Sequence, residues 1–335
     1  MPVSDAALPV NTRARFGLKG AFLLAAVLLL AAWTGAAFWF QLGPTMRWVG
    51  IAAVVVLAVG VVRLGQRRRV YSWLTLALAL VAVALWWVSI KPSDSRDWAP
   101  DVAHGVTAQM QDAEVVVQNV RNFEWHSETD FTPHWETRRY NPDAITSVDL
   151  FTSVWGSPAI AHTLISFGFS DGQHLVFSAE IRREKGEEFS EIGGFFKQFE
   201  LVMIAATESD IIRLRTNARG EEVHRYPLKM DPAQARELFI SFLQMGNELA
   251  REPQFYQTIT SNCTTVIFRL ARLVDPGIPL DWRVLLSGYF PEYLYDRGLI
   301  SNDRPFTAIK AVAAISAKAQ ANPDAADYSE MIRAK

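Results

Sequence analysis

Three long apolar segments near the N-terminus constrain this chain more than any other feature, because they predict three membrane-spanning helices. The first covers residues 17–42, in which Lys19 is the one charged residue. The second runs from Trp48 to Val62, and the third, from Ser72 to Ile90, carries no charge. A helix of about 20 apolar residues crosses the hydrocarbon core of a bilayer, which is about 30 Å thick. Half-buried helices of soluble proteins carry polar residues every three or four positions, and these segments do not.

Basic residues around these segments indicate their orientation. They form two clusters: Arg13, Arg15 and Lys19 before or at the start of the first segment, and Arg63, Arg67, Arg68 and Arg69 between the second and third. The loop between the first and second segments has only Arg47 at its edge. Loops rich in Lys and Arg stay in the cytoplasm. The sequence therefore predicts a multi-pass protein of a bacterial inner membrane, with a cytoplasmic N-terminus and a periplasmic C-terminal domain.

The chain divides by composition into five parts. We predict a cytoplasmic N-terminus at 1–16, a three-helix transmembrane region at 17–90, a linker at 91–105, a periplasmic domain at 106–305 and an Ala-rich helical tail at 306–335. The net charge of −2 gives no strongly basic surface, so nucleic acid is not an expected partner.

The predicted periplasmic domain has the pattern of an α+β fold. The segments with strand patterns are 113–123, 135–140, 144–149, 161–169, 174–183, 199–206, 211–216 and 223–228. The Asp-Gly pair within residues 170–173 predicts a β-hairpin. Two amphipathic helices follow, one from Asp231-Pro232 to about Ala250 and one from near Asn262 to before Asp275. We therefore expect an α+β domain after the three apolar segments.

Cys263 is the only cysteine, and it lies in Ser261-Asn262-Cys263-Thr264-Thr265, where we expect a helix to begin. A lone thiol in an oxidising compartment has no disulfide partner in its own chain, so it is either a buried core side chain or a nucleophile. The free N–H groups and the positive dipole end of a helix start favour a thiolate and can also bind an oxyanion. Asn262 and Thr264 are therefore oxyanion-site candidates beside a catalytic Cys263.

A thiolate nucleophile needs a base, and His162 on the predicted hairpin is our candidate. A three-residue turn would place Glu180 opposite His162 and make it the third catalytic residue, whereas a two- or four-residue turn would place Ile181 there. His174, beside the turn, is a competing base. A zinc site formed by His126, Asp130 and His134 is a further alternative, although we expect no metal and no cofactor.

The residues around this pair resemble the periplasmic domain of the Lnb-type lipoprotein N-acyltransferases. The segments that carry the resemblance are Val120–Phe123, Trp135–Arg138, Ala161–Phe167, Ser178–Arg182 and Asn262–Thr265. It covers residues 95–300, in the same order throughout. The membrane helices of this chain precede the domain, whereas in that family they follow it. The resemblance implies a permuted papain-like (NlpC-like) Cys–His fold, in which an antiparallel sheet is packed on helices.

What the resemblance implies for function is acyl transfer through a thioester on Cys263, with His162 as base. Phospholipid and a lipoprotein amine are then the expected partners, and Arg121 and Arg182 become candidates for contacts with substrate. The short polar linker and the apolar segment Leu285–Phe290 favour contact with a bilayer surface. An NlpC-like amidase or peptidase acting on cell-wall peptides remains an alternative, as does a non-catalytic envelope module whose cysteine is buried.

Overall fold

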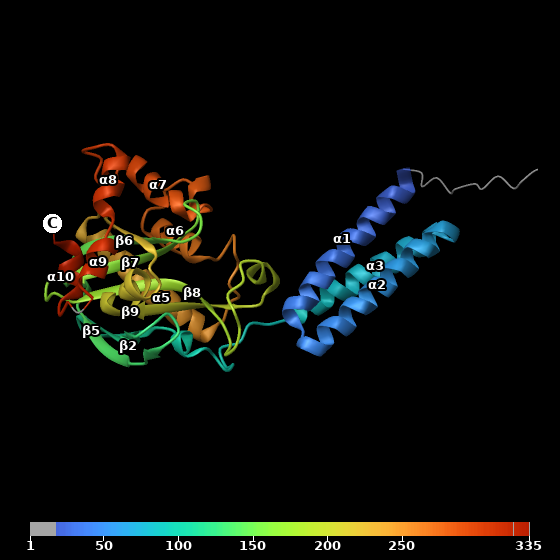
Figure 1. Cartoon of the computed structure of the whole chain (residues 1–335), viewed down its shortest axis with the longest axis horizontal. Helices are drawn as coiled ribbons and strands as arrows, with labels where there is room; N and C mark the ends of the chain where they lie inside the picture. The colour runs from blue at the N-terminus through green and yellow to red at the C-terminus, as the bar shows by residue number, and fades with distance from the viewer. Residues whose placement is uncertain (1–17, 324, 335) are drawn as a thin grey trace, which may run out of the picture. The chain divides into compact units, whose positions relative to one another are not determined.

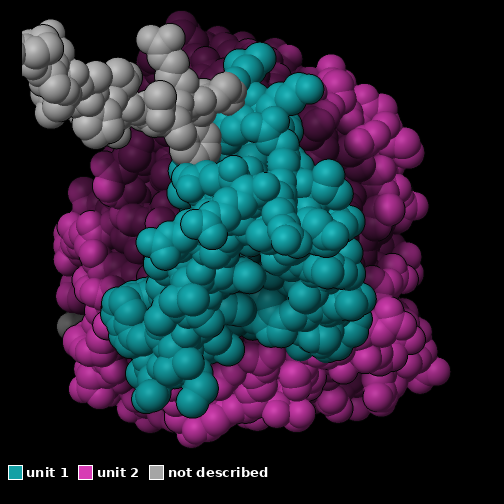
Figure 2. All heavy atoms as spheres, turned by 90° about the vertical axis from the view of Figure 1, so that its right-hand side faces the viewer, with its two compact units in different colours: residues 1–91 teal, residues 92–335 magenta. Residues whose placement is uncertain are grey.

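The computed structural model describes residues 18–323 and 325–334. The predictions for the cytoplasmic N-terminus at 1–16, including Arg13 and Arg15, lie outside the described residues. The chain divides into two compact units, Met1–Lys91 and Pro92–Lys335, which Figure 2 colours separately. We describe each unit by itself.

The first unit consists of three long apolar helices, α1 Leu18–Gln41, α2 Pro44–Arg67 and α3 Arg69–Ser89 (Figure 1). Each is long and apolar enough to cross a membrane, judged by length and composition. The second helix is longer than the apolar segment that predicted it, because it includes Arg47 and Arg63 near its ends. Ser72 is fully buried and donates from its hydroxyl to the carbonyl oxygen of Val61 at 2.8 Å, which ties α3 to α2.

The second unit is built on an eight-stranded mixed sheet in the order β1-β2-β9-β8-β7-β6-β10, with β5 beside β2. The strands are β1 Thr107–Gln111, β2 Glu114–Arg121, β5 Trp135–Tyr140, β6 Ile145–Val154, β7 Ala161–Phe169, β8 His174–Arg182, β9 Glu200–Ala206 and β10 Glu222–Pro227, and a separate hairpin pairs β3 Glu124–Trp125 with β4 Phe131–Thr132. The sheet departs from the antiparallel prediction because β2 and β9 run parallel. The α+β class predicted from the sequence is confirmed.

Helices cover both faces of this sheet. They are α4 Glu208–Arg213, α5 Pro232–Arg251, α6 Cys263–Val274, α7 Phe290–Asp296, α8 Phe306–Ala313, α9 Ser316–Ala321 and α10 Tyr328–Arg333. Short 3₁₀ turns cover Pro100–Val102, Pro142–Ala144, Gly193–Phe196, Trp282–Val284 and Ser287–Tyr289, and a π-helical turn, η4, covers Leu214–Ala218.

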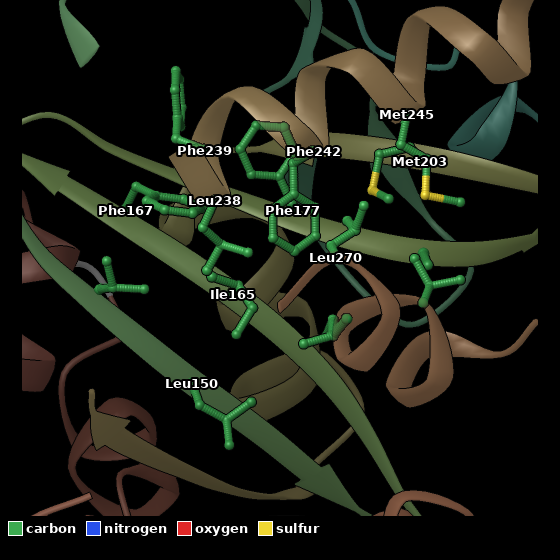
Figure 3. Packing of buried hydrophobic residues seen from close by; sticks show 14 of the residues in the cluster. Leu150, Ile165, Phe167, Phe177, Met203, Leu238, Phe239, Phe242, Met245 and Leu270 are labelled. Carbon is green, nitrogen blue, oxygen red and sulfur yellow. The ribbon is translucent and has the colours of Figure 1, made fainter. Parts of the chain in front are cut away.

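The larger core lies between the sheet and helices α5 and α6. Alternate residues of β7 and β8 point into it, and Phe177 stacks on Phe242 with ring centroids 5.0 Å apart (Figure 3). Phe167 meets Phe239 edge to face at 5.2 Å. Each fully buried large side chain of this kind contributes about 1.5–3 kcal/mol relative to an exposed one. This packing fixes β7, β8 and the start of α6, which carry the predicted catalytic residues.

A second core on the opposite face involves the C-terminal residues. Ile315, Ala319, Tyr328 and Ile332 are buried there together with residues of β6, β7, β8 and β9. The segment predicted as an Ala-rich helical tail thus consists of short helices, and the last two cover the sheet.

The prediction of a strand at 211–216 is wrong. Thr207 caps a helix by accepting from the backbone N–H of Asp210 at 3.2 Å, and α4 follows. Ile211 and Ile212 are both fully buried, so consecutive apolar residues face one core and imitate a strand pattern. The chain then continues into the π-helical turn.

Candidate active site

Cys263 is the first residue of α6, and a capping box fixes the start of that helix. The backbone N–H of Thr265 donates to Asn262 Oδ1 at 2.8 Å, and the backbone N–H of Asn262 donates to Thr265 Oγ1 at 2.9 Å. Asn262 also donates through Nδ2 to the carbonyl oxygen of Thr258 at 2.8 Å. The Asn262 side chain is therefore occupied as a cap and is not an oxyanion donor.

The sulfur of Cys263 lies at the edge of β7, where that strand no longer pairs with β8. The two strands pair over Ile165–Gly168, and the first residues of β7 lie beyond this ladder. Cys263 Sγ is 4.0 Å from the carbonyl oxygen of Ala161 and accepts a hydrogen bond from the backbone of Thr163. The neighbouring N–H of Ala161 donates to Ser287 Oγ at 2.8 Å. The thiol thus lies against backbone groups of β7 that do not pair with β8.

His162 and Glu180 face each other across the hairpin. The turn consists of Ser170–Gly172, because Gly168 pairs with His174 and the backbone N–H of Phe169 donates to Gln173. This three-residue turn puts position 162 opposite position 180, and His162 Nε2 lies 3.1 Å from Glu180 Oε1. The register that would bring Ile181 to this place does not occur.

Two further side chains join this pair, and neither was predicted from the sequence. Ser178 Oγ lies 2.6 Å from His162 Nε2 and donates to Glu180 Oε1 at 2.7 Å. Arg215 Nη2 donates to the same carboxylate oxygen at 3.0 Å. Ser178 lies two residues before Glu180 on one strand, so the shared face was a usable signal. Arg215 gave no such signal, because its segment was predicted as a strand.

The surroundings of Cys263 and His162 favour an ion pair. Burial raises the pKa of the Cys263 thiol, but the charge and hydrogen bond of His162 and the hydrogen bonds from Thr163 lower that pKa to about 6. Burial and Arg215 lower the pKa of His162, yet the carboxylate of Glu180 and the thiolate of Cys263 raise it to about 9. Between these two values the thiol is ionised and the imidazole is protonated.

Glu180 supplies the negative charge behind the imidazole. Burial raises the pKa of the Glu180 carboxyl, but His162, Arg215 and Ser178 together hold that pKa well below its usual value. Because Nε2 of His162 faces Ser178 and Glu180, Nδ1 is the ring nitrogen left for the thiol. The imidazolium thus lies between the thiolate and the carboxylate, as in catalytic triads whose carboxylate orients the base.

The start of α6 supplies donors for an oxyanion. A helix leaves the amide N–H groups of its first turn without intrahelical acceptors, and Asn262 caps only that of Thr265. The N–H groups of Cys263 and Thr264 therefore lie beside the sulfur as donors. The side chain of Thr264 is fully buried, with Oγ1 3.1 Å from Thr163 Oγ1, so its role is to pack α6 against β7.

Arg121 and Arg182 are engaged in contacts within the domain and do not join Cys263, His162 and Glu180. Arg121 is buried and forms a two-point ion pair with Asp210 at 2.8 and 2.9 Å. Arg182 donates to Asp94 and to the carbonyl oxygens of Val102 and Ala103, which anchors the start of the second unit. These contacts give both residues a structural role, and their assignment as substrate contacts stays a prediction.

The other histidines do not join the candidate site. His174 Nδ1 contacts the carbonyl oxygen of Gly172 at the hairpin turn. His126 Nε2 lies 3.1 Å from Thr132 Oγ1, while His134 Nδ1 contacts Glu136 at 3.1 Å. Among the described residues, no group of three His, Cys, Asp or Glu side chains is arranged to hold a metal ion.

Exposed apolar side chains lie on the two segments that precede β7 and α7, and we call them the apolar rim. Its members are Trp155 and Ile160 before β7, and Trp282, Leu285 and Leu286 before α7; they are between 38% and 58% exposed. The two loops touch, because the N–H of Gly288 donates to the carbonyl oxygen of Ala159 at 3.0 Å. A side chain at Gly288 would collide with the carbonyl of Pro158. The rim thus lies directly beside Ala161 and His162.

Two hollows of the second unit do not contain the thiol. One of about 780 Å³ lies between β1 and α5, and one of about 330 Å³ lies between the start of the unit, β9 and α5. Neither is lined by Cys263, His162 or Glu180. The thiol, which is buried at 9% exposure, therefore lies outside both hollows.

Comparison with known proteins places this site in a family context. A family model described as the Lnb N-terminal periplasmic domain matches residues 131–288, which include His162, Glu180 and Cys263. The match confirms the resemblance drawn from the sequence. No curated protein and no solved structure matches the chain. Together with the three apolar helices, the family match indicates a membrane-associated envelope protein with a periplasmic domain.

Proposed function

On the premise that residues 131–288 are similar to the Lnb N-terminal periplasmic domain, we propose that this chain is a membrane-anchored, periplasmic acyltransferase. Cys263 is its nucleophile, His162 its acid and base, and Glu180 the group that orients the imidazole. The observation that carries the proposal is the ordered set Cys263–His162–Glu180, which favours an ionised thiol.

The first half-reaction forms a thioester. The Cys263 thiolate adds to the carbonyl carbon of a phospholipid ester, and the N–H groups at the start of α6 bind the oxyanion. When the carbon–oxygen bond to the leaving alcohol breaks, protonated His162 gives its proton to that oxygen. The products are the lyso-lipid, the acyl group on Cys263 and neutral His162.

The second half-reaction returns the enzyme to its starting state. An amine, for which the N-terminus of a lipoprotein is the expected acceptor, adds to the thioester carbonyl. Neutral His162 takes the proton that the amine loses, and the thiolate leaves as the new amide forms. The imidazolium and thiolate are then restored, so the reaction is a ping-pong transfer without a cofactor.

The apolar rim supports a lipid as acyl donor. Exposed apolar side chains gathered beside a nucleophile suit a substrate with hydrocarbon chains. An amidase that acts on cell-wall peptides would use the same three side chains, but it has no need of such a rim.

Mass spectrometry of the full chain purified from membranes tests the proposal. We expect an acyl adduct on Cys263 that neutral hydroxylamine removes, and we expect its loss in Cys263→Ala and His162→Ala. The matched control is His174→Ala, which removes a histidine of the same hairpin outside the site and should retain the adduct. An unmodified Cys263 in protein supplied with phospholipid vesicles, or full transfer activity in Cys263→Ser, would contradict the proposal.

A further inference from the structure

Arg215 connects the candidate site to a second carboxylate, that of Glu221, whose side chain is 11% exposed. The side chain of Arg215 is 4% exposed, and it donates to Glu180 Oε1 through Nη2 at 3.0 Å and to Glu221 Oε2 through Nη1 at 3.5 Å. Glu221 also accepts from Ser153 Oγ on β6. Within the described residues, Nε of Arg215 has no hydrogen-bond partner. The guanidinium is therefore shared between two carboxylates that lie on different elements.

An unusual backbone turn places Arg215 there. It belongs to η4, the π-helical turn Leu214–Ala218. Such turns are rare in proteins, and those that occur often lie at functional sites. Two side-chain contacts from the C-terminal helices hold the turn: Gln320 Nε2 donates to the carbonyl oxygen of Thr216 at 2.8 Å, and Tyr328 Oη lies 2.9 Å from Thr216 Oγ1. The position of Arg215 is thus fixed by tertiary packing.

Charges alternate along this line of side chains. The thiolate of Cys263 is followed by the imidazolium of His162, the carboxylate of Glu180, the guanidinium of Arg215 and the carboxylate of Glu221. Among the described residues, three titratable or charged groups on neighbouring segments act on this line. Arg219 lies 3.7 Å from Glu221 and 4.0 Å from Glu128. Arg121 on β2 acts on Glu180 from a distance, and the phenol of Tyr256 interacts with Cys263 and Glu180.

We propose that Arg215 is a positioning residue of the active site, which divides its charge between Glu180 and Glu221 and so sets how strongly Glu180 holds the imidazolium of His162. The proposal rests on the role of Cys263 and His162 in the proposed function. It assigns to Arg215 and Glu221 opposite effects on His162. The cation disfavours the protonated ring, and a carboxylate behind the cation offsets that effect because its charge has the opposite sign.

The pH dependence of thiol alkylation by iodoacetamide separates these effects. It is measured on the purified full chain in detergent, without any acyl donor, and Cys263 is the only thiol. The lower inflection of the rate reports ionisation of Cys263, and the upper one reports loss of the proton from His162. We expect Arg215→Gln to move the upper inflection to higher pH by about one unit or more, and Glu221→Gln to move it to lower pH.

Two further variants control for folding and for charge. Arg333 likewise bridges two buried carboxylates, Asp149 at 2.7 Å and Glu208 at 2.6 Å, but outside this line. Arg333→Gln should therefore lose stability and leave both inflections in place. Arg215→Lys keeps the charge and should restore the upper inflection towards the wild-type value. If Arg215→Gln does not fold, the downward shift in Glu221→Gln tests the proposal alone.

Two outcomes distinguish this proposal from the proposed function. Inflections that are unchanged in both Arg215→Gln and Glu221→Gln, beside a wild-type profile that shows an ionised thiol, would overturn the role of Arg215 only. A wild-type profile without the lower inflection would overturn the Cys263–His162 pair and both proposals with it.

Discussion

At the scale of single residues, the chemistry of this chain depends on one thiol whose neighbours favour its ionised form. Burial alone would make Cys263 an inert core side chain, and at 9% exposure it is nearly enclosed. The imidazolium of His162 and the hydrogen bonds of Thr163 reverse that preference and lower the pKa of Cys263 to about 6. The thiolate of Cys263 can therefore be both buried and ionised, because the imidazolium of His162 interacts with it.

Removing His162 should return the thiol to its ordinary range. In His162→Ala the pKa of Cys263 rises, so the thiolate fraction at pH 7 and the iodoacetamide alkylation rate fall by about a hundredfold. His174→Ala serves as the control and should alkylate at the wild-type rate. Equal rates in all three proteins would mean that His162 does not ionise the thiol.

Removing the charge of Glu180 should act on the base. Glu180 raises the pKa of His162, so that pKa falls in Glu180→Gln. The alkaline limb of the pH–rate profile should therefore move to lower pH. We expect the transfer rate at neutral pH to fall about tenfold to a hundredfold as the imidazole loses its orientation. An alkaline limb that stays in place in a pH–rate profile would show that Glu180 has no electrostatic role.

At the scale of elements, the site is formed by a hairpin and by a helix start. Both have local sequence signals: Gly172 at φ +86 closes the turn that sets His162 opposite Glu180, and Asn262 caps the helix that begins with Cys263. The hairpin and the helix start were predicted, because short-range chemistry determines them, whereas the length of the turn, and with it the partner of His162, was left open. Arg215 was not predictable, because packing by Gln320 and Tyr328 holds its π-helical turn.

The capping box gives a stability prediction. Asn262→Ala leaves the N–H of Thr265 without its acceptor and should lower the free energy of unfolding by about 1 kcal/mol. Asn262→Ser retains a capping oxygen and should remain within a few tenths of a kcal/mol of the wild type. Thermal unfolding of the full chain in detergent measures both, and indistinguishable midpoints for the alanine and serine variants would contradict the role of the cap.

At the scale of the whole molecule, three apolar helices and one α+β domain share the chain. The sequence predicted these parts well, since apolar length and strand alternation are strong signals. It did not reveal that the last helices cover the sheet: Arg333 forms ion pairs with Asp149 and Glu208, which are far from it in sequence. Such long-range ion pairs leave no local pattern.

The orientation of the helices is tested by thiol labelling in the Cys263→Ala background. Gln66→Cys lies beside the basic turn between α2 and α3, and Ser95→Cys lies after α3. Because basic loops stay inside, a membrane-impermeant maleimide should label Ser95→Cys but not Gln66→Cys in intact spheroplasts. The reverse labelling pattern would place the domain in the cytoplasm and remove the periplasmic function.

The most direct test of the central claim is a titration of the Cys263 thiolate itself. Since the chain has one cysteine, the ultraviolet absorbance of wild type minus that of Cys263→Ala follows this sulfur alone as the pH is raised. We predict a midpoint near pH 6, which moves upwards when His162 is replaced by Ala. A midpoint at or above the value of an ordinary thiol, about 8.5, would contradict the account.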